Sequence, residues 1–130
     1  MNLVLDASAG FELLLTTTAG HAILRQVPPR AEWWVPEHYF IEVAGAIRRA
    51  EYTKAITAPQ ALSAFDALCR GRLHRVQVRP LLDEAWARRG HLTVADAVYV
   101  ILAEQIGARL VTADLKLAGS PGLRVPTITP

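Results

Sequence analysis

Cysteine is almost absent from this sequence, because Cys69 is the only one in 130 residues. A single thiol excludes an internal disulfide and favours a reducing compartment, so we expect a cytoplasmic protein. No apolar run approaches the roughly 20 residues that a membrane-spanning helix needs, and the first residues lack the pattern of a secretory signal. The length suits one domain, residues 1–130, that buries a core without disulfides or metals as staples.

Several phosphate-binding and metal-binding motifs are missing as well. Neither G-x-G-x-x-G nor G-x-x-x-x-G-K-[ST] occurs, which excludes the usual dinucleotide-binding and P-loop domains. The four histidines have no H-E-x-x-H or Cys/His spacing, so a zinc site is not expected.

Lysine is scarce, with only two among the fourteen basic residues. The planar guanidinium of arginine suits phosphate recognition and permits a nucleic-acid partner, although arginine-rich codon usage produces the same bias. Apolar residues make up 52% of the chain, a surplus that favours an interface and a homodimer.

Short apolar runs alternate with longer helical patterns along the whole chain. This alternation is typical of βαβ units, which give a mostly parallel sheet with helices on both faces. We therefore expect an α/β fold, a five-stranded α/β/α sandwich. The expected strands are residues 3–5, 33–35, 75–78, 109–112 and 125–128, and the expected helices are residues 7–15, 36–49, 59–69, 80–88, 93–106 and 115–118.

Two aspartates stand where predicted strands end. Asp6 directly follows the first strand, and Asp114 comes two residues after the fourth. In open parallel sheets, ligands bind beyond the carboxyl ends of the strands, which favours a functional role for both residues. Aspartate is also a favoured helix N-cap, and a helix is expected after each of them. Both interpretations remain open.

Glu42 lies on a predicted helix without a lysine or arginine three or four residues away. Ordinary exposed helices often supply such a partner. The small residues Gly45 and Ala46 leave room beside the carboxylate, and Arg49 lies on the same side two turns further on. The alternative is an ordinary solvated surface glutamate.

Asp96 begins the most apolar of the predicted helices. Together with Thr93 it fits a capping box, which is a purely structural explanation. On a helix, however, it shares a face with Tyr99, Val100 and Ala103. A carboxylate on an apolar face is costly unless positive charge or N–H groups meet it.

Carboxylates that converge without a cation repel one another and raise their own pKa values. Hard divalent cations such as Mg²⁺ and Mn²⁺ take oxygen ligands of this kind. We therefore predict a Mg²⁺ (or Mn²⁺) site formed by Asp6, Glu42, Asp96 and Asp114. The basic cluster at Arg88 and Arg89 precedes the helix of Asp96; it is either a solvated loop or, with Arg49, a contact to a phosphate backbone.

The segments that contain the four acids resemble the PIN-domain family, and more narrowly the VapC-type toxins of toxin–antitoxin pairs. The resemblance covers essentially the whole chain, in the order and spacing of the family. Ala95 departs from it, since many relatives have an aromatic residue there, and so does Leu117, where some have a further acid. The matching segments are Leu3–Ala9, Pro36–Val43, Ala46–Arg49, Leu92–Tyr99, Leu102–Glu104 and Gly107–Asp114.

This resemblance implies a PIN-like sandwich and a Mg²⁺- or Mn²⁺-dependent endoribonuclease that uses the four acids for metal binding and catalysis. It also implies polar support from Ser8 and Thr112, an RNA substrate and a cognate antitoxin. One alternative is a PIN nuclease of RNA processing that has no antitoxin. Another is a PIN-like scaffold that binds RNA or protein and does not cut.

Overall fold

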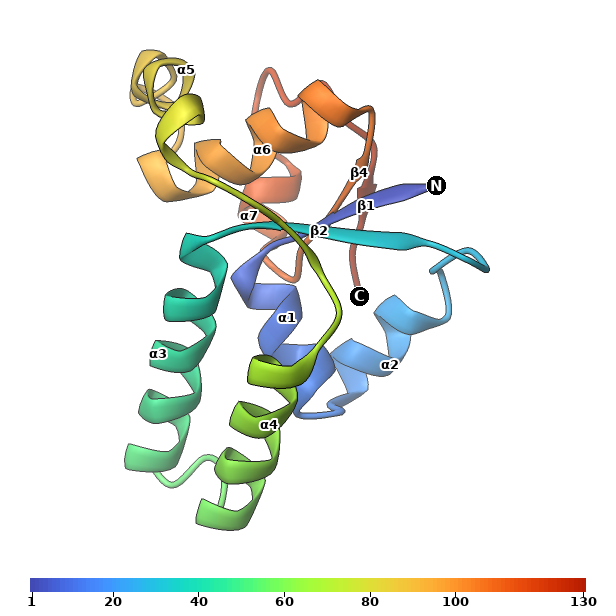
Figure 1. The fold of residues 1–130 in the computed structure, drawn as a ribbon, viewed down its shortest axis with the longest axis vertical. Coiled ribbons are helices and arrows are strands. Elements are labelled where there is room, and N and C mark those ends of the chain that lie inside the picture. The colour runs from blue at the N-terminus through green and yellow to red at the C-terminus, as the bar shows by residue number, and fades with distance from the viewer.

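Five parallel strands lie at the centre of the structure, a computed structural model that describes residues 1–130 (Figure 1). Their spatial order is β3-β2-β1-β4-β5, and all four neighbouring pairs are parallel. The chain therefore builds outward from β1 in one direction first and then in the other, which places the topological switch point between β1 and β4. The strands are β1 (Asn2–Leu5), β2 (Glu32–Pro36), β3 (His74–Val76), β4 (Arg109–Val111) and β5 (Thr127–Ile128).

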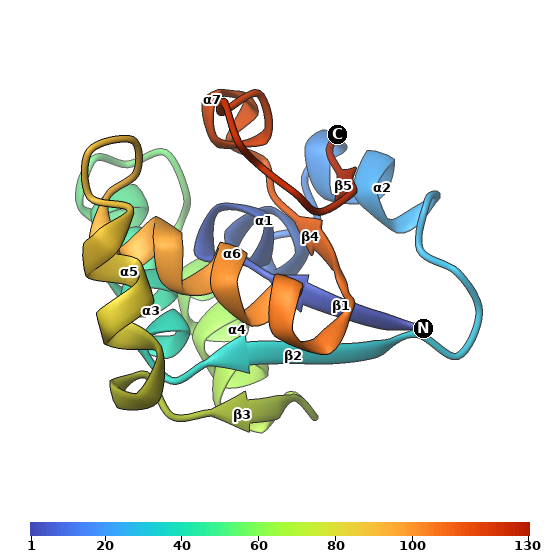
Figure 2. The same cartoon turned by 90° about the horizontal axis from the view of Figure 1, so that it is seen from above.

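Helices cover both faces of this sheet. Figure 1 shows α1 to α4 on one side of the strands and α5 and α6 on the other, and Figure 2 shows α6 lying along β1. The helices are α1 (Ala7–Leu14), α2 (Thr18–Leu24), α3 (His38–Tyr52), α4 (Ala58–Arg70), α5 (Leu82–Ala87), α6 (Val94–Ile106) and α7 (Leu115–Ala118), with a short 3₁₀ helix η1 (Arg79–Leu81) before α5.

The expected α/β/α sandwich is confirmed, and its sheet is entirely parallel. Helix α2 was not predicted, because β-branched threonines and Gly20 are poor helix formers. The threonine hydroxyl of Thr17 nevertheless caps this helix by accepting a hydrogen bond from the Gly20 N–H at 3.1 Å, and Ile23 anchors it in the core. The prediction that Pro36 opens a helix was wrong, since Pro36 ends β2 and α3 begins at His38.

Helix α6 is the most deeply buried element. Every residue from Ala97 to Ala103 is buried, as expected of a helix that is apolar on all sides. It packs against β1, β2 and β4. None of the helices, α6 included, is long and apolar enough to cross a membrane. Because most of α6 is buried in the core, the position of Asp96 on the first turn of this helix is fixed.

Close packing of α2 on α1 gives a test of the fold. A Cβ added at Gly20 would lie 2.3 Å from the main-chain oxygen of Glu12, an atom that no side-chain rotation can move away. We expect Gly20→Ala to lower the free energy of unfolding by about 2 kcal/mol, measured by urea denaturation. Gly90→Ala is the control, because nothing lies within 4 Å of its added Cβ. Equal stability of the two variants would contradict the close approach of α1 and α2.

Candidate active site

All four predicted acids line one pocket of about 520 Å³. The pocket lies at the carboxyl edge of the sheet, beside the switch point between β1 and β4. Asp6 and Asp114 reach it from the turns that follow these strands, whereas Glu42 comes from α3 and Asp96 from α6. Arg49 and Ser8 line the same pocket. The fold thus brings together residues that lie up to 108 positions apart in the sequence.

Asp6 is a helix cap and a pocket residue at the same time. Its Oδ1 atom accepts hydrogen bonds from the Ala9 N–H at 2.9 Å and from the Ser8 hydroxyl at 2.7 Å. Its own N–H donates to the carbonyl of Val111 on β4 at 3.1 Å. Only 3% of the residue is exposed. The capping interpretation and the pocket interpretation therefore both hold.

Asp114 is likewise both a helix cap and a pocket residue. Its Oδ1 atom accepts hydrogen bonds from the N–H groups of Lys116 and Leu117, at 3.0 and 3.2 Å, and so caps α7. The N–H of Asp114 donates to the hydroxyl of Thr112 at 3.0 Å. Ser8 joins this turn to the turn after β1, because its Oγ lies 3.2 Å from the Thr112 hydroxyl and accepts the Ala113 N–H at 3.0 Å. Ser8 and Thr112 thus tie the two strand ends together.

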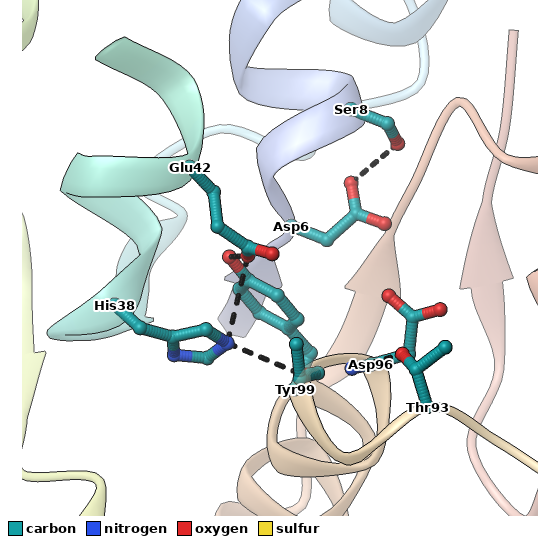
Figure 3. A network of polar contacts seen from close by, with 8 residues as sticks. Asp6, Ser8, His38, Glu42, Thr93, Asp96 and Tyr99 are labelled. Carbon is teal, nitrogen blue, oxygen red and sulfur yellow. Dashed lines mark hydrogen bonds and ion pairs between the residues drawn. The ribbon is translucent and has the colours of Figure 1, made fainter. Parts of the chain in front are cut away.

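Figure 3 shows the carboxylates of Glu42 and Asp96 directed toward the space beside Asp6. The Oε1 atom of Glu42 accepts a hydrogen bond of 2.6 Å from the hydroxyl of Tyr99 and lies 3.5 Å from His38 Nε2. Only one of the two hydrogen bonds of a capping box is present at Asp96. Its N–H donates to the Thr93 hydroxyl at 3.1 Å, but its carboxylate accepts no hydrogen bond from the Thr93 N–H.

The pocket has a deficit of positive charge. Burial raises the pKa of Asp6 above its ordinary value, and the charge of Asp96 adds to the rise, while hydrogen bonds from Ala9, Thr112 and Ser8 oppose it. None of the four acids pairs with a lysine or arginine; the one ion-pair partner is His38, beside Glu42.

The pKa of Asp96 is raised in the same way. Burial is the main cause, and the neighbouring charges of Asp114 and Glu42 add to it, while Thr93 and His38 oppose it. Asp96 therefore lies close enough to the charges of Asp114 and Glu42 for its own pKa to rise.

The donor set fits a hard divalent cation, because four carboxylates without a lysine or arginine partner are the ligands that Mg²⁺ and Mn²⁺ prefer. The side chains are not gathered on one point, however: no three of the histidine, cysteine, aspartate and glutamate side chains are grouped closely enough to hold one ion. Sharing one cation would require some of the carboxylates to rotate.

The predicted RNA-contacting arginines separate into two groups. Arg49 lines the pocket. Arg88 does not, because its guanidinium forms a two-pronged ion pair with Glu104, at 3.0 and 2.6 Å, on the partly buried face of α6. Arg89 stacks over Trp86, with its guanidinium carbon 4.5 Å from the ring centroid.

Tyr99 is one of the residues of this site that the sequence pattern did not indicate, together with Glu12, which lines the pocket, and His38, which lies beside Glu42. Tyr99 was counted as part of an apolar helix face, whereas its hydroxyl meets the carboxylate of Glu42. The available signal was its spacing, since a residue three positions after Asp96 lies on the same side of the helix.

Comparison with known proteins places this architecture in a family. Residues 3–119 match the PIN domain. The chain is 40% identical over 121 residues to Ribonuclease VapC12 of Mycobacterium tuberculosis, which covers 92% of both chains. The chain therefore belongs to the PIN-domain family, among the VapC ribonucleases.

Two solved structures share the fold at lower identity. VapC20 of Mycobacterium tuberculosis, a sarcin-ricin loop cleaving toxin, is 15% identical with a TM-score of 0.65, over 91% of this chain and 95% of that one. A chain of VapBC2 of Rickettsia felis, bound to a DNA fragment from its promoter, is 15% identical with a TM-score of 0.64, over 98% of both chains. At this identity the likeness concerns the fold alone.

The raised pKa of Asp96 gives a stability prediction. Since the folded state holds this proton more tightly than the unfolded state, stability falls as pH rises above about 3.8, the ordinary pKa. In metal-free protein at pH 7, Asp96→Asn should therefore raise the free energy of unfolding. The expected gain is below about 1 kcal/mol, because the half-buried carboxylate is partly screened by solvent.

Urea denaturation at pH 7 and at pH 3 measures this difference, which should disappear at the lower pH. Asp66→Asn is the matched control, because Asp66 is exposed on α4 and its nearest cation, the Arg70 guanidinium, is 3.8 Å away. A loss of stability in Asp96→Asn at pH 7 would show that its charge is not repelled.

Proposed function

We propose that this chain is the toxin of a toxin–antitoxin pair, an endoribonuclease that hydrolyses RNA phosphodiester bonds with Mg²⁺ or Mn²⁺. One observation carries the proposal: four acids from four separate segments line a single pocket at the switch point of the sheet. It is supported by family membership and by the 40% identity to a VapC ribonuclease. The chain acts in the cytoplasm, as a single domain and as a homodimer.

Asp6, Glu42, Asp96 and Asp114 would hold the divalent cation. When bound, it would supply positive charge that lowers the pKa of a water molecule and stabilises the charge developing on the scissile phosphate. Asp6 is buried, and a low-dielectric surrounding strengthens the electrostatic interactions of its carboxylate. In-line attack of water on phosphorus, with cleavage of the P–O3′ bond, would leave a 5′-phosphate and a 3′-hydroxyl.

Other residues of the pocket orient this machinery. Ser8 donates its hydroxyl proton to Asp6, and through Thr112 it fixes the turn that carries Asp114. Arg49 lines the pocket without an ion pair, so its guanidinium remains available for a phosphate of the RNA backbone. The arginines outside the pocket have partners within the chain and are weaker candidates for this contact.

The alternatives differ in what they predict for partners and activity. A PIN nuclease of RNA processing would have the same pocket and no cognate inhibitor. A scaffold that does not cut has no need of four acids in one pocket, and this chain keeps all of them. The 40% identity to a VapC ribonuclease favours the toxin over the processing enzyme.

Asp96→Asn tests the catalytic assignment. The amide keeps the size of the side chain and leaves the main-chain bond to Thr93 in place, but it is a neutral and poorer ligand for a hard cation. We expect cleavage of total RNA in Mg²⁺ or Mn²⁺ to fall at least about 100-fold, the scale of losing a catalytic charge. Mapping of the new RNA ends identifies the products.

EDTA should abolish cleavage by the unchanged protein while leaving its circular dichroism spectrum intact, because the core consists of apolar strands and helices. Asp66→Asn should cleave normally. Full activity of Asp96→Asn, or activity that persists in EDTA, would contradict the mechanism.

Expression of the chain alone should arrest bacterial growth, and co-expression of a small protein encoded beside it should relieve the arrest. The reason is the toxin role proposed above, which includes a cognate antitoxin. Colony counts after induction measure the effect, and Asp96→Asn expressed to the same level is the control. Normal growth at high expression of the unchanged chain would favour the RNA-processing alternative.

A further inference from the structure

One oxygen of Glu42 is already occupied. Its Oε1 atom accepts the hydroxyl proton of Tyr99 at 2.6 Å, and His38 Nε2 approaches the same atom at 3.5 Å. No group of the chain donates a hydrogen bond to Oε2. The two oxygens of this carboxylate therefore have different surroundings, and Oε2 is the one free to take an external ligand (Figure 3).

Tyr99 is a rigid donor. Only 1% of the residue is exposed, and it lies in the continuously buried part of α6, one turn after Asp96. The hydroxyl of Tyr99 has a single proton, and this proton is donated to the Glu42 carboxylate. The hydrogen bond thus fixes Glu42, on α3, relative to Asp96, on α6.

His38 makes a second link between the same two helices. Its Nε2 atom lies 3.1 Å from the carbonyl oxygen of Ala95, the residue before Asp96. A carbonyl and a carboxylate oxygen both accept only, so Nε2 is the ring nitrogen that carries a proton. The ring lies 4.7 Å from the ring of Tyr99, and its Nδ1 atom is buried without a hydrogen-bond partner. A buried polar atom without a hydrogen-bond partner costs free energy, which indicates that the ring is present for the contacts of Nε2 with Ala95 and Glu42.

We propose that Tyr99 and His38 are positioning residues for Glu42: Tyr99 holds Oε1 by its hydrogen bond, His38 lies against the same oxygen while its ring is fixed to the Ala95 carbonyl, and Oε2 is left for the divalent cation. Neither residue touches the cation itself. The inference rests on the proposed function, since it assigns how one ligand of that site is oriented. In this arrangement, Glu42 has only one oxygen available for the cation, and the contact between α3 and α6 determines how that oxygen is directed.

Calorimetric titration of the metal-free protein with Mn²⁺ tests the proposal without any measurement of activity. Tyr99→Phe removes the hydroxyl and keeps the ring, and we expect the dissociation constant for Mn²⁺ to rise about 10-fold. Tyr39→Phe is the matched control. Tyr39 is another buried tyrosine, but its hydroxyl makes no hydrogen bond to any of the acids, so its loss should leave Mn²⁺ binding unchanged.

A double-mutant cycle separates positioning from a general effect on the fold. If Tyr99 acts through Glu42, Tyr99→Phe should weaken Mn²⁺ binding in the unchanged protein and have no further effect in Glu42→Gln. A merely structural role would give the same loss in both backgrounds and would overturn the proposal. His38→Phe, which keeps a ring beside Tyr99 without a donor, is the second variant and should weaken binding in the same direction.

The outcomes distinguish this proposal from the function on which it rests. Absence of Mn²⁺ binding by the unchanged protein at millimolar concentration would overturn both. Normal Mn²⁺ binding by Tyr99→Phe and by His38→Phe, with weak binding by Glu42→Gln, would overturn the positioning role and leave the metal site standing.

Discussion

Repulsion among carboxylates is the constraint on which the rest of this structure depends. Asp6 and Asp96 have raised pKa values because they are buried near other acids, and no lysine or arginine pairs with them. The fold must supply the free energy that keeps such groups together. It does so with one apolar core of 26 buried residues, which runs through the sheet and the whole middle of α6.

Helix caps reduce this cost at two of the four acids. Asp6 and Asp114 each accept hydrogen bonds from main-chain N–H groups at the start of a helix, and such groups stabilise a negative charge. A structural role and a functional role are therefore not alternatives here. Capping holds the carboxylate in place and makes its charge tolerable, while the end of the parallel strand delivers it to the pocket.

The sequence was sufficient to predict the parallel sandwich and the gathering of the four acids at one pocket, because both follow from local patterns: apolar runs that end in aspartate and helices that start near them. It was not sufficient for α2, where the Thr17 cap and the burial of Ile23 outweigh weak helix propensity. Nor did it predict the bond from Tyr99 to Glu42, residues 57 positions apart, because that contact depends on how α3 and α6 cross. The pairing of Arg88 with Glu104 likewise depends on how two helices pack, in this case α5 against α6.

The pocket also contains one arginine, Arg49, that forms no ion pair. Arg49 lies two turns after Glu42 on the same side of α3, and its Nη1 atom would lie 3.5 Å from a Cβ at Gly45. The guanidinium therefore extends back along the helix toward Glu42. It passes over Gly45 and Ala46, which are small enough to leave room for it. It forms no ion pair with the acids, so it neither neutralises their charge nor fills their place. A site that binds a cation and a phosphate together needs both signs of charge close by but not paired, and small residues between Glu42 and Arg49 allow that arrangement.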